Sequence, residues 1–186
     1  MAVQSTNAIL EVPPMKEAIL SAAVDVVVLH GLNNWTVEEV ANRAHCAKGL
    51  VNYHYRSKQE LLVQVAHTIR DDRSARRLAA IQTVGTQALD RLWAALALEI
   101  ESGWFAAWIS FLAADGLLRD AAKATPRDSL AFAEGLGRAL DLGDLLVPRA
   151  ALIDAALNGL QLGLLQGASP RTMEEDYHRF WLTVLP

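Results

Sequence analysis

Helix-start signals recur along this chain, and no segment shows the sustained alternation of apolar and polar residues that marks a strand. Thr36-Val37-Glu38-Glu39 and Ser57-Lys58-Gln59-Glu60 each place a hydroxyl residue ahead of a glutamate at the spacing of a capping box. In this motif the hydroxyl and the carboxylate accept hydrogen bonds from backbone amides at the start of a helix. The chain is therefore predicted to be all-α.

Apolar spacing and punctuation together predict about nine helices. The first helix begins at Pro13-Pro14 and ends at Gly31, and a long fourth helix runs from Ser57 to about Ala80. Two short helices lie between them, over residues 36–44 and 48–53. The five later helices are expected at residues 87–102, 104–119, 126–141, 148–166 and 170–184. Because no low-complexity linker follows the fourth helix, it is expected to join the two halves rigidly.

Composition indicates a globular protein, since 52% of the 186 residues are apolar and 20% are charged. The single cysteine, Cys46, excludes an intramolecular disulfide framework and favours a cytoplasmic location. The opening MAVQSTNAILEVPP lacks the basic region and long apolar stretch of a secretory leader. Glu99, Glu101 and Gly103 interrupt the most apolar stretch, Leu92–Ala114, which is therefore expected to be a buried helix and not a membrane span.

Charge is distributed unevenly along the chain. The formal net charge is −4, yet residues 1–80 carry +1 and residues 81–186 carry −5. The window Val40–Gln59 contains no Asp or Glu at all, although it contains several Lys, Arg and His residues. A polyanionic partner is therefore expected to meet the N-terminal part of the chain.

Helices as short as those at 36–44 and 48–53, with only His45-Cys46-Ala47 between them, cannot pack antiparallel and are expected to form a bent pair. Small Ala41 would face the first helix, and Val40 and Val51 would fill the angle. This is the helix-turn-helix pattern, whose second helix enters the major groove of DNA. Asn52 would suit an adenine edge, and donors such as Lys58 would suit phosphates.

Residues 36–62, TVEEVANRAHCAKGLVNYHYRSKQELL, resemble the DNA-binding domain of the TetR family of bacterial transcriptional repressors. The resemblance extends back through KEAILSAAVDVVVLHGL. It implies a three-helix DNA-binding domain over residues 1–56, and a helical effector-binding and dimerisation domain over residues 57–186. The implied function is a repressor that binds a palindromic operator as a homodimer and is released by a small molecule. The positions that match the DNA contacts of the family are Thr36, Lys48, Gly49, Asn52, Tyr53, His54 and Lys58.

Some positions depart from the pattern of the family. His45 stands where glycine is usual, so it must tolerate a left-handed conformation, which histidine does better than β-branched residues. Ala47 stands where Ser or Thr often caps the recognition helix, a loss of about 1 kcal/mol. Arg56 replaces the usual Pro or Gly and offers a further phosphate contact. Cys46 is expected to be a small apolar turn residue rather than a reactive thiol.

The C-terminal half offers two further sets of candidate residues. Small residues recur every fourth position on one helix, and aromatic residues share one face of the last helix, which together suggest a dimer interface of Ala155, Gly159, Gly163, Tyr177 and Trp181. The candidate effector pocket consists of Trp93, Trp104, Trp108 and Phe111. These aromatic side chains would suit an apolar effector, and because Glu99 and Glu101 are close to them in sequence, a cationic effector would also be suited.

Other readings remain open from the sequence. A TetR-fold regulator could act without a small-molecule ligand, or as an activator. An enzyme is disfavoured, because His67, Asp71 and Asp72 form the only close grouping of histidine and carboxylates, with no nucleophile motif beside it. An interaction module that does not bind DNA is disfavoured by Tyr53, His54 and Lys58. No metal ion or cofactor is expected, since no Cys/His cluster has the spacing of a zinc site.

Overall fold

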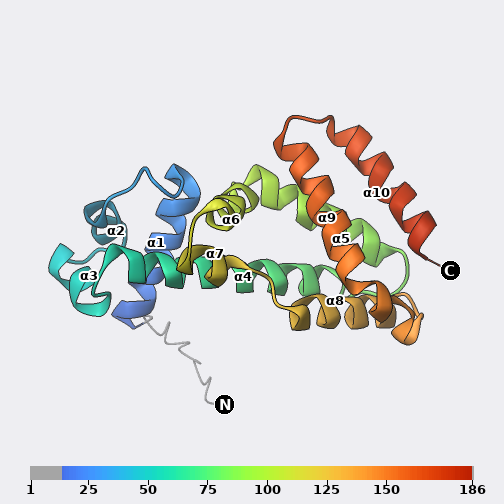
Figure 1. Cartoon of the computed structure of the whole chain (residues 1–186), viewed down its shortest axis with the longest axis horizontal. Coiled ribbons are helices and arrows are strands. Elements are labelled where there is room, and N and C mark those ends of the chain that lie inside the picture. The colour runs from blue at the N-terminus through green and yellow to red at the C-terminus, as the bar shows by residue number, and fades with distance from the viewer. Residues whose placement is uncertain (1–13, 186) are drawn as a thin grey trace, which may run out of the picture.

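Residues 14–185 are described by a computed structural model, and they form an elongated all-helical molecule (Figure 1). The expected all-α fold is confirmed. The elements are α1 (Met15–His30), α2 (Val37–Arg43), α3 (Lys48–His54), α4 (Lys58–Ala80), α5 (Gln87–Glu101), α6 (Trp104–Ala113), α7 (Leu117–Ala122), α8 (Pro126–Ala139), the 3-10 helix η1 (Gly143–Arg149), α9 (Ala150–Leu165) and α10 (Pro170–Val184). Pro13 and the segment assessed for a leader lie outside the described residues.

Two predicted helices differ from those observed. The segment 104–119 is two helices, because the chain turns through extended Ala114 and through Gly116, whose φ of 60° lies in the left-handed region. The segment expected to begin at Pro148 begins earlier, as the 3-10 helix η1, with Pro148 inside it. The described residues therefore contain one more α-helix than the sequence suggested.

The first hydrophobic core holds the helix-turn-helix unit to the middle of the molecule. Its fully buried side chains include Ile19 of α1, Val40 of α2, Leu61 of α4, and Phe105 and Phe111 of α6. The core therefore continues past the first three helices. The contact between α1 and α6 is close at Gly103, where an added Cβ would lie 3.3 Å from the carbonyl oxygen of Val28. Glycine there has φ 79°, so both the backbone conformation and the space favour it.

The second hydrophobic core lies at the opposite end, among α5, α8, α9 and α10 (Figure 1). Tyr177 of α10 is fully buried, and its hydroxyl donates to the carbonyl oxygen of Leu89 at 2.7 Å. Trp181 is also buried, and its ring packs edge-on against Tyr177. The expectation that these two aromatic side chains face a partner subunit is wrong, because both are part of the core of a single chain.

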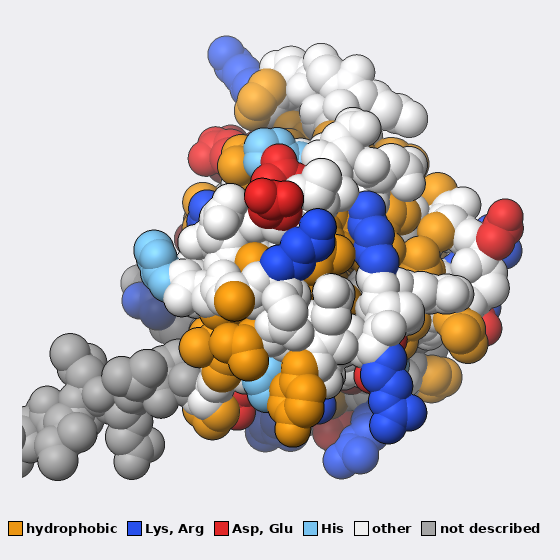
Figure 2. All heavy atoms as spheres, turned by 90° about the vertical axis from the view of Figure 1, so that its left-hand side faces the viewer, with side chains coloured by type: hydrophobic (Ala, Val, Ile, Leu, Met, Phe, Trp, Pro, Cys, Tyr) orange, Lys and Arg blue, Asp and Glu red, His pale blue; other side chains and the backbone are white. Residues whose placement is uncertain are grey.

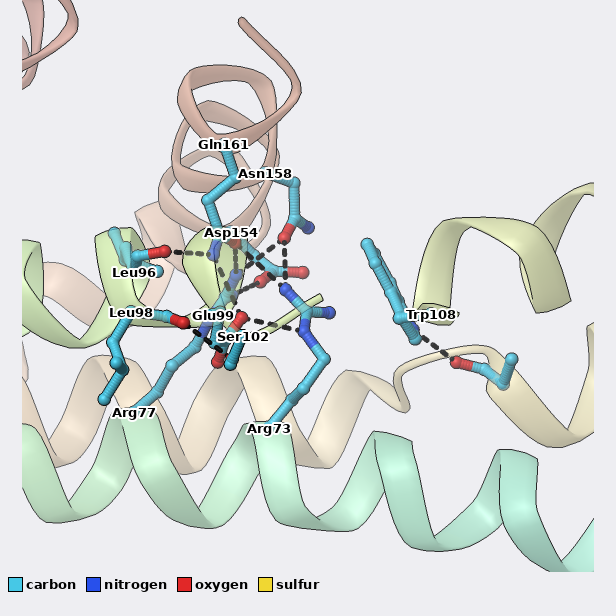
Figure 3. Close-up of polar contacts among 11 residues, drawn as sticks. Arg73, Arg77, Leu96, Leu98, Glu99, Ser102, Trp108, Asp154, Asn158 and Gln161 are labelled. Carbon is cyan, nitrogen blue, oxygen red and sulfur yellow. Dashed lines mark hydrogen bonds and ion pairs between the residues drawn. The ribbon is translucent and has the colours of Figure 1, made fainter. Parts of the chain in front are cut away.

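Helix α4 connects the two cores, and its buried arginines join it to α5 and α9 (Figure 3). Arg73 Nε donates to Glu99 Oε2 at 3.0 Å, and Arg77 Nη1 donates to Asp154 Oδ1 at 2.7 Å. Both guanidinium groups also donate to Gln161 Oε1, at 3.0 and 2.9 Å. Charges this far from water are tolerated only when they are paired and hydrogen-bonded. The polar cluster of Arg73, Arg77, Glu99, Asp154, Asn158 and Gln161 is called the α4–α9 network below.

Burial, and then the neighbouring charge of Arg77, lower the pKa of Arg73 to about 10, while the charge of Glu99 opposes the shift. Arg73 therefore stays cationic at neutral pH. Its guanidinium carbon lies 3.8 Å from the ring centroid of Trp108, whose Nε1 donates to the Ala122 carbonyl oxygen at 2.9 Å. Trp108 stacks on the Arg73 guanidinium from the side opposite Glu99 and so helps to hold its orientation (Figure 3).

The apolar stretch Leu92–Ala114 does not form one straight helix, because α5 and α6 meet at 70°. The segment Gly143–Leu165 is the one unbent helix among the described residues with the length and hydropathy to cross a membrane. It packs against α5, α8 and α10, and its polar residues face the arginines of α4.

Glu99→Gln is predicted to lower the free energy of unfolding by about 3–5 kcal/mol, because it leaves the buried Arg73 charge without its counter-charge. Urea denaturation followed by circular dichroism measures the effect. Glu101→Gln on the exposed side of the same helix is the matched control and should change stability by no more than about 0.5 kcal/mol. Equal effects of the two substitutions would show that the network does not stabilise the fold.

Candidate nucleic-acid interface

The capping box at the start of α2 is formed as the sequence predicts. Thr36 Oγ1 accepts from the Glu39 amide at 3.2 Å, and Glu39 Oε2 accepts from the Thr36 amide at 2.6 Å. The hydrogen bonds from the Thr36 amide and then from its hydroxyl hold the pKa of Glu39 below its ordinary value of 4.5. The box satisfies exposed amides of the first turn and sets where α2 begins.

The turn between α2 and α3 has the geometry expected from its residues. His45 has φ 53°, so the left-handed conformation predicted for it is confirmed. The Cys46 amide donates to the Ala41 carbonyl oxygen at 2.9 Å and closes the turn. Ala47 is the N-cap of α3 and supplies no side-chain hydrogen bond, as predicted. Helix α3 is therefore positioned by packing rather than by its cap.

Helix α3 presents a polar face away from the molecule. Val51 is buried and anchors the helix to α1 and α2, whereas Lys48, Gly49, Asn52 and Tyr53 are exposed. These four lie at i, i+1, i+4 and i+5, which places them on one side of a helix. Tyr53 is 79% exposed, a large fraction for an aromatic side chain. His54 is half-buried, with its ring edge against Tyr53 at 5.2 Å between centroids.

Two of the other residues matched to DNA contacts already have structural partners. Lys58 Nζ donates to the Trp35 carbonyl oxygen at 2.8 Å and lies 4.2 Å from the centroid of the Trp35 ring. Lys58 therefore ties the start of α4 to the segment before α2. The Thr36 hydroxyl is engaged in its capping box. Both residues are exposed at the edge of the α3 face, so each borders this surface while holding the fold.

The role of Trp35 was not predicted from the sequence, although this residue precedes the N-cap of α2 and contacts Lys58 at the start of α4. Its side chain is buried, and its Nε1 donates to the Leu32 carbonyl oxygen at 3.0 Å. It stands directly before the N-cap Thr36, the position of the hydrophobic staple that fixes how a chain enters a helix. That position was the available signal, although its contact with Lys58 depends on the tertiary fold.

The second capping box is only half formed. Ser57 Oγ accepts from the Glu60 amide at 3.0 Å, as predicted. The Glu60 carboxylate accepts instead from the amide of Arg56, at 3.1 Å, one residue earlier than expected. The start of α4 is still capped, because the Ser57 hydroxyl and the Glu60 carboxylate each accept a hydrogen bond from a backbone amide.

The end of the molecule that carries α3 is rich in Lys and Arg side chains (Figure 2). Arg43 is paired with Asp25 of α1 at 2.9 Å, which neutralises its charge locally. The Lys48 ammonium lies 4.0 Å from Glu38, a loose pair with both side chains largely exposed. Such exposed pairs are weak, so Lys48 is able to exchange its carboxylate for a phosphate.

The four residues expected to form an effector pocket do not all lie together, because Trp104, Trp108 and Phe111 belong to the first core whereas Trp93 packs against the second. Trp93 stacks on Tyr177 in the second core, with ring centroids 5.1 Å apart. Phe111 is fully buried in the first core, and Trp104 lies under the Arg76 guanidinium at 4.4 Å. The cause is the 70° angle between α5 and α6, which sends their aromatic residues to different sides.

Of the four, Trp108 borders an inner cavity. The inner cavity, of about 40 Å³, lies between α4, α6, α8 and α9 and touches the arginines of the network. Beside it an open groove of about 600 Å³ runs between α8 and α9. Ala124, Ser129, Asp154 and Asn158 line both, so the two spaces adjoin.

Comparison with known proteins agrees with this geometry. Residues 19–65 match the sequence profile of the family described as bacterial regulatory proteins, tetR family. A transcriptional regulator from Rhodococcus sp. Rha1 is similar with a TM-score of 0.69 at 23% identity, over 91% of this chain and 95% of that one. A TetR-family transcriptional regulator from Streptomyces coelicolor is similar with a TM-score of 0.61 at 19% identity, over 92% and 98% of the two chains.

The multidrug binding protein EbrR, in complex with imidazole, is similar with a TM-score of 0.55 at 21% identity, over 94% of this chain and 97% of that one. At these identities the structures establish a shared fold. A comparison with curated protein sequences finds no match. The bent α2–α3 pair and its matching profile define a helix-turn-helix transcriptional regulator. Residues 19–65 therefore form a DNA-binding domain of the TetR type, and the chain as a whole shares the fold of TetR-family regulators.

Thr36→Val is predicted to lower the free energy of unfolding by about 1 kcal/mol at neutral pH, because α2 loses the oxygen of its N-cap. Since the pKa of Glu39 is lowered in the folded state, the contribution of its carboxylate is present above 4.5 and is lost as the pH falls through the folded-state pKa. Urea denaturation at neutral and acidic pH measures both. Thr183→Val, whose hydroxyl donates within α10 at 3.0 Å and caps nothing, is the control.

Proposed function

We propose that this protein is a transcriptional repressor that acts in the cytoplasm, binds a palindromic DNA operator as a homodimer and is released by a small molecule. The exposed polar face of α3, held by buried Val51 on a rigid core, is the observation that carries the proposal. In this proposal residues 1–56 contact DNA, and residues 57–186 bind the effector and the second subunit.

Each exposed residue of α3 has chemistry suited to a part of the DNA duplex. The Asn52 side chain can donate to and accept from an adenine edge in the major groove. Lys48 and Tyr53 offer a cation and a hydroxyl to backbone phosphates, which position the helix without reading sequence. An added Cβ at Gly49 would meet no atom within 4 Å, so this position offers open space where DNA can approach the backbone. His54, Thr36 and Lys58 would contribute at the margins.

The outward face of α9 supports a dimer. Its polar residues Asp154, Asn158 and Gln161 point inward to the network, so its exposed side is left with Leu152, Ala155, Gly159 and Leu162. An ordinary surface helix has one apolar stripe, which faces the core, whereas α9 has this stripe at Ile153 and Leu157 and an exposed apolar side as well. An exposed apolar face of this kind indicates a protein–protein contact.

The small-residue strip proposed from the sequence divides into two parts. A Cβ on Gly159 would meet no atom within 4 Å, and Ala155 is also exposed, so both are available to a second copy. A Cβ on Gly163 would lie 2.7 Å from Met173 Sδ, so Gly163 serves the packing of α10 on α9 instead. We therefore place the two-fold axis near Gly159. In the resulting dimer the two α3 helices would meet successive major grooves, about 34 Å apart or somewhat more.

Helix α4 provides a route from an effector to DNA. Its first residue, Lys58, holds the segment before α2, and its arginines contact the cavity, α5 and α9. A small molecule that favours one position of α4 over another would change the distance between the two recognition helices. A coupling free energy of about 1–3 kcal/mol would change operator affinity by roughly 5- to 150-fold. The imidazole-bound structure of EbrR supports small-molecule binding by a protein of this fold.

Lys48→Ala is predicted to weaken binding to every duplex sequence and to reduce the salt dependence of binding by about one unit of slope, because one phosphate contact is lost. Arg171→Ala removes the same charge from the far end of the molecule and should leave binding unchanged. Fluorescence anisotropy on an operator selected from a random DNA pool, at several salt concentrations, measures both.

In the same assay Asn52→Ala should relax base preference at one position per half-site, by about 1–3 kcal/mol of discrimination. Equal losses for Lys48→Ala and Arg171→Ala would refute the proposed DNA surface. A uniform loss across all sequences for Asn52→Ala would refute base reading by that residue.

Gly159→Arg is predicted to convert the dimer to a monomer without destabilising the chain, because the added side chain meets open space in one subunit and blocks close approach of a second α9. Sedimentation velocity at micromolar concentration measures the association state, and circular dichroism checks the fold. Leu98→Arg, on the exposed side of α5, is the control and should remain dimeric. A dimeric Gly159→Arg variant would place the interface elsewhere.

A further inference from the structure

The inner cavity combines apolar walls, from Trp108, Ala124 and Phe132, with several hydrogen-bond donors. Arg70, Arg73 and Arg77 border it, together with the hydroxyl of Ser74 and the amide of Asn158. Asp128 and Asp154 are the two acids in its lining, which leaves one more arginine than carboxylates. Each of these arginines has one ion-pair partner: Arg70 pairs with Asp71 at 2.8 Å, Arg73 with Glu99 at 3.0 Å and Arg77 with Asp154 at 2.7 Å.

Both acids in the lining are already committed to partners. The Asp128 carboxylate accepts from the amide and hydroxyl of Thr125, at 2.8 and 2.7 Å, in the capping box of α8. Asp154 Oδ1 holds Arg77 Nη1 at 2.7 Å. A cationic molecule that entered the cavity would have to compete with these contacts for its counter-charge.

The donors are not all committed. The Arg77 side chain is over nine-tenths buried, and its Nε has no acceptor among residues 14–185. Asn158 Oδ1 accepts from both arginines, at 3.4 and 2.7 Å, which leaves the amide NH₂ of Asn158 as a further available donor. A buried charged donor without an acceptor is costly, and an anion placed beside it would remove that cost.

The size and lining of the two spaces indicate what kind of molecule could bind in them. A cavity of about 40 Å³ has room for a small head group only. The adjoining groove of about 600 Å³ is lined mostly by apolar side chains, including Leu130, Val147 and Pro148. A head in the cavity and an apolar tail in the groove would satisfy both surfaces.

We propose that this site binds a small monocarboxylate, with the carboxylate against Arg77 and Asn158 and its apolar tail between α8 and α9. The inference deepens the proposed function by naming the chemical class of the effector, and it replaces the apolar or cationic molecule that the sequence suggested. A carboxylate on Arg77 competes with Asp154 for the guanidinium, so binding would loosen α4 from α9, the helix proposed to face the second subunit.

The test compares three molecules of equal length with the full-length protein: hexanoate, hexanamide and hexylammonium. Isothermal calorimetry should detect hexanoate and show at least tenfold weaker binding of the other two, since a hydrogen bond to a charged group contributes about a factor of ten or more. Along acetate, butyrate and hexanoate, affinity should rise about fourfold for each added CH₂. Hexylammonium or hexanamide binding as tightly as hexanoate would overturn the proposal.

Two variants locate the site. Arg77→Lys should weaken hexanoate about tenfold or more, while Arg76→Lys, its exposed neighbour on α4, should not. Because Arg77→Lys disturbs a buried network, Ala151→Trp at the exposed rim of the groove provides a second measurement. It should weaken hexanoate but not acetate, since only the longer tail reaches the groove. Unchanged hexanoate binding in Ala151→Trp would overturn the proposed site.

Failure of this inference is separable from failure of the proposed function. A protein that selects a palindromic operator but binds no carboxylate would remain a DNA-binding regulator with another effector. A protein that binds hexanoate as described but selects no DNA sequence would refute the repressor and keep the carboxylate site. Operator selection and calorimetry are therefore carried out on the same preparation.

Discussion

The two arginines that α4 buries, Arg73 and Arg77, constrain much of the C-terminal architecture. A buried guanidinium must find its counter-charge and its hydrogen-bond acceptors within the protein, because water cannot reach it. Glu99 supplies them from α5, and Asp154, Asn158 and Gln161 supply them from α9. Three helices from distant parts of the chain are thereby held in one arrangement (Figure 3). The same arrangement leaves Arg77 Nε without an acceptor, beside the cavity.

The network also explains the unusual character of α9. A helix whose polar residues are drawn inward by buried arginines has only small and apolar residues left for its outer face. That outer face, around Gly159, is the one we propose for the second subunit. One set of ion pairs thus accounts for both the interior contacts of α9 and the surface that it offers.

At the other end of the molecule, the helix-turn-helix unit shares its core with α6. Phe105 and Phe111 pack with residues of α1 and α4, and Gly103 allows close contact with Val28. The exposed face of α3 is therefore held both by α4 and by the α1–α6 contact. A shift of α4 relative to α5 and α9 would move that face with it, which is the physical basis of the proposed release from DNA.

Local features could be predicted from the sequence because their hydrogen bonds join residues only a few positions apart. The capping box of Thr36 and Glu39, the left-handed His45 and the uncapped Ala47 all follow from neighbouring residues. The polar face of α3 follows in the same way, since helical spacing alone places Lys48, Asn52 and Tyr53 together. The family resemblance rests on the same segment, although His45 and Ala47 depart from the pattern of the family.

Contacts between distant segments could not be predicted in this way. The same aromatic spacing that suggested an effector pocket is compatible with core packing, and the 70° bend between α5 and α6 assigns Trp93 and Trp108 to different surroundings. Tyr177 and Trp181 are buried for the same reason, because the orientation of α10 on α9 decides which face meets solvent. The sequence by itself determined most of the helices, the capping box of α2 and the polar face of α3. Only the tertiary structure decided which charges are buried together, because that depends on helices far apart in the chain coming into contact.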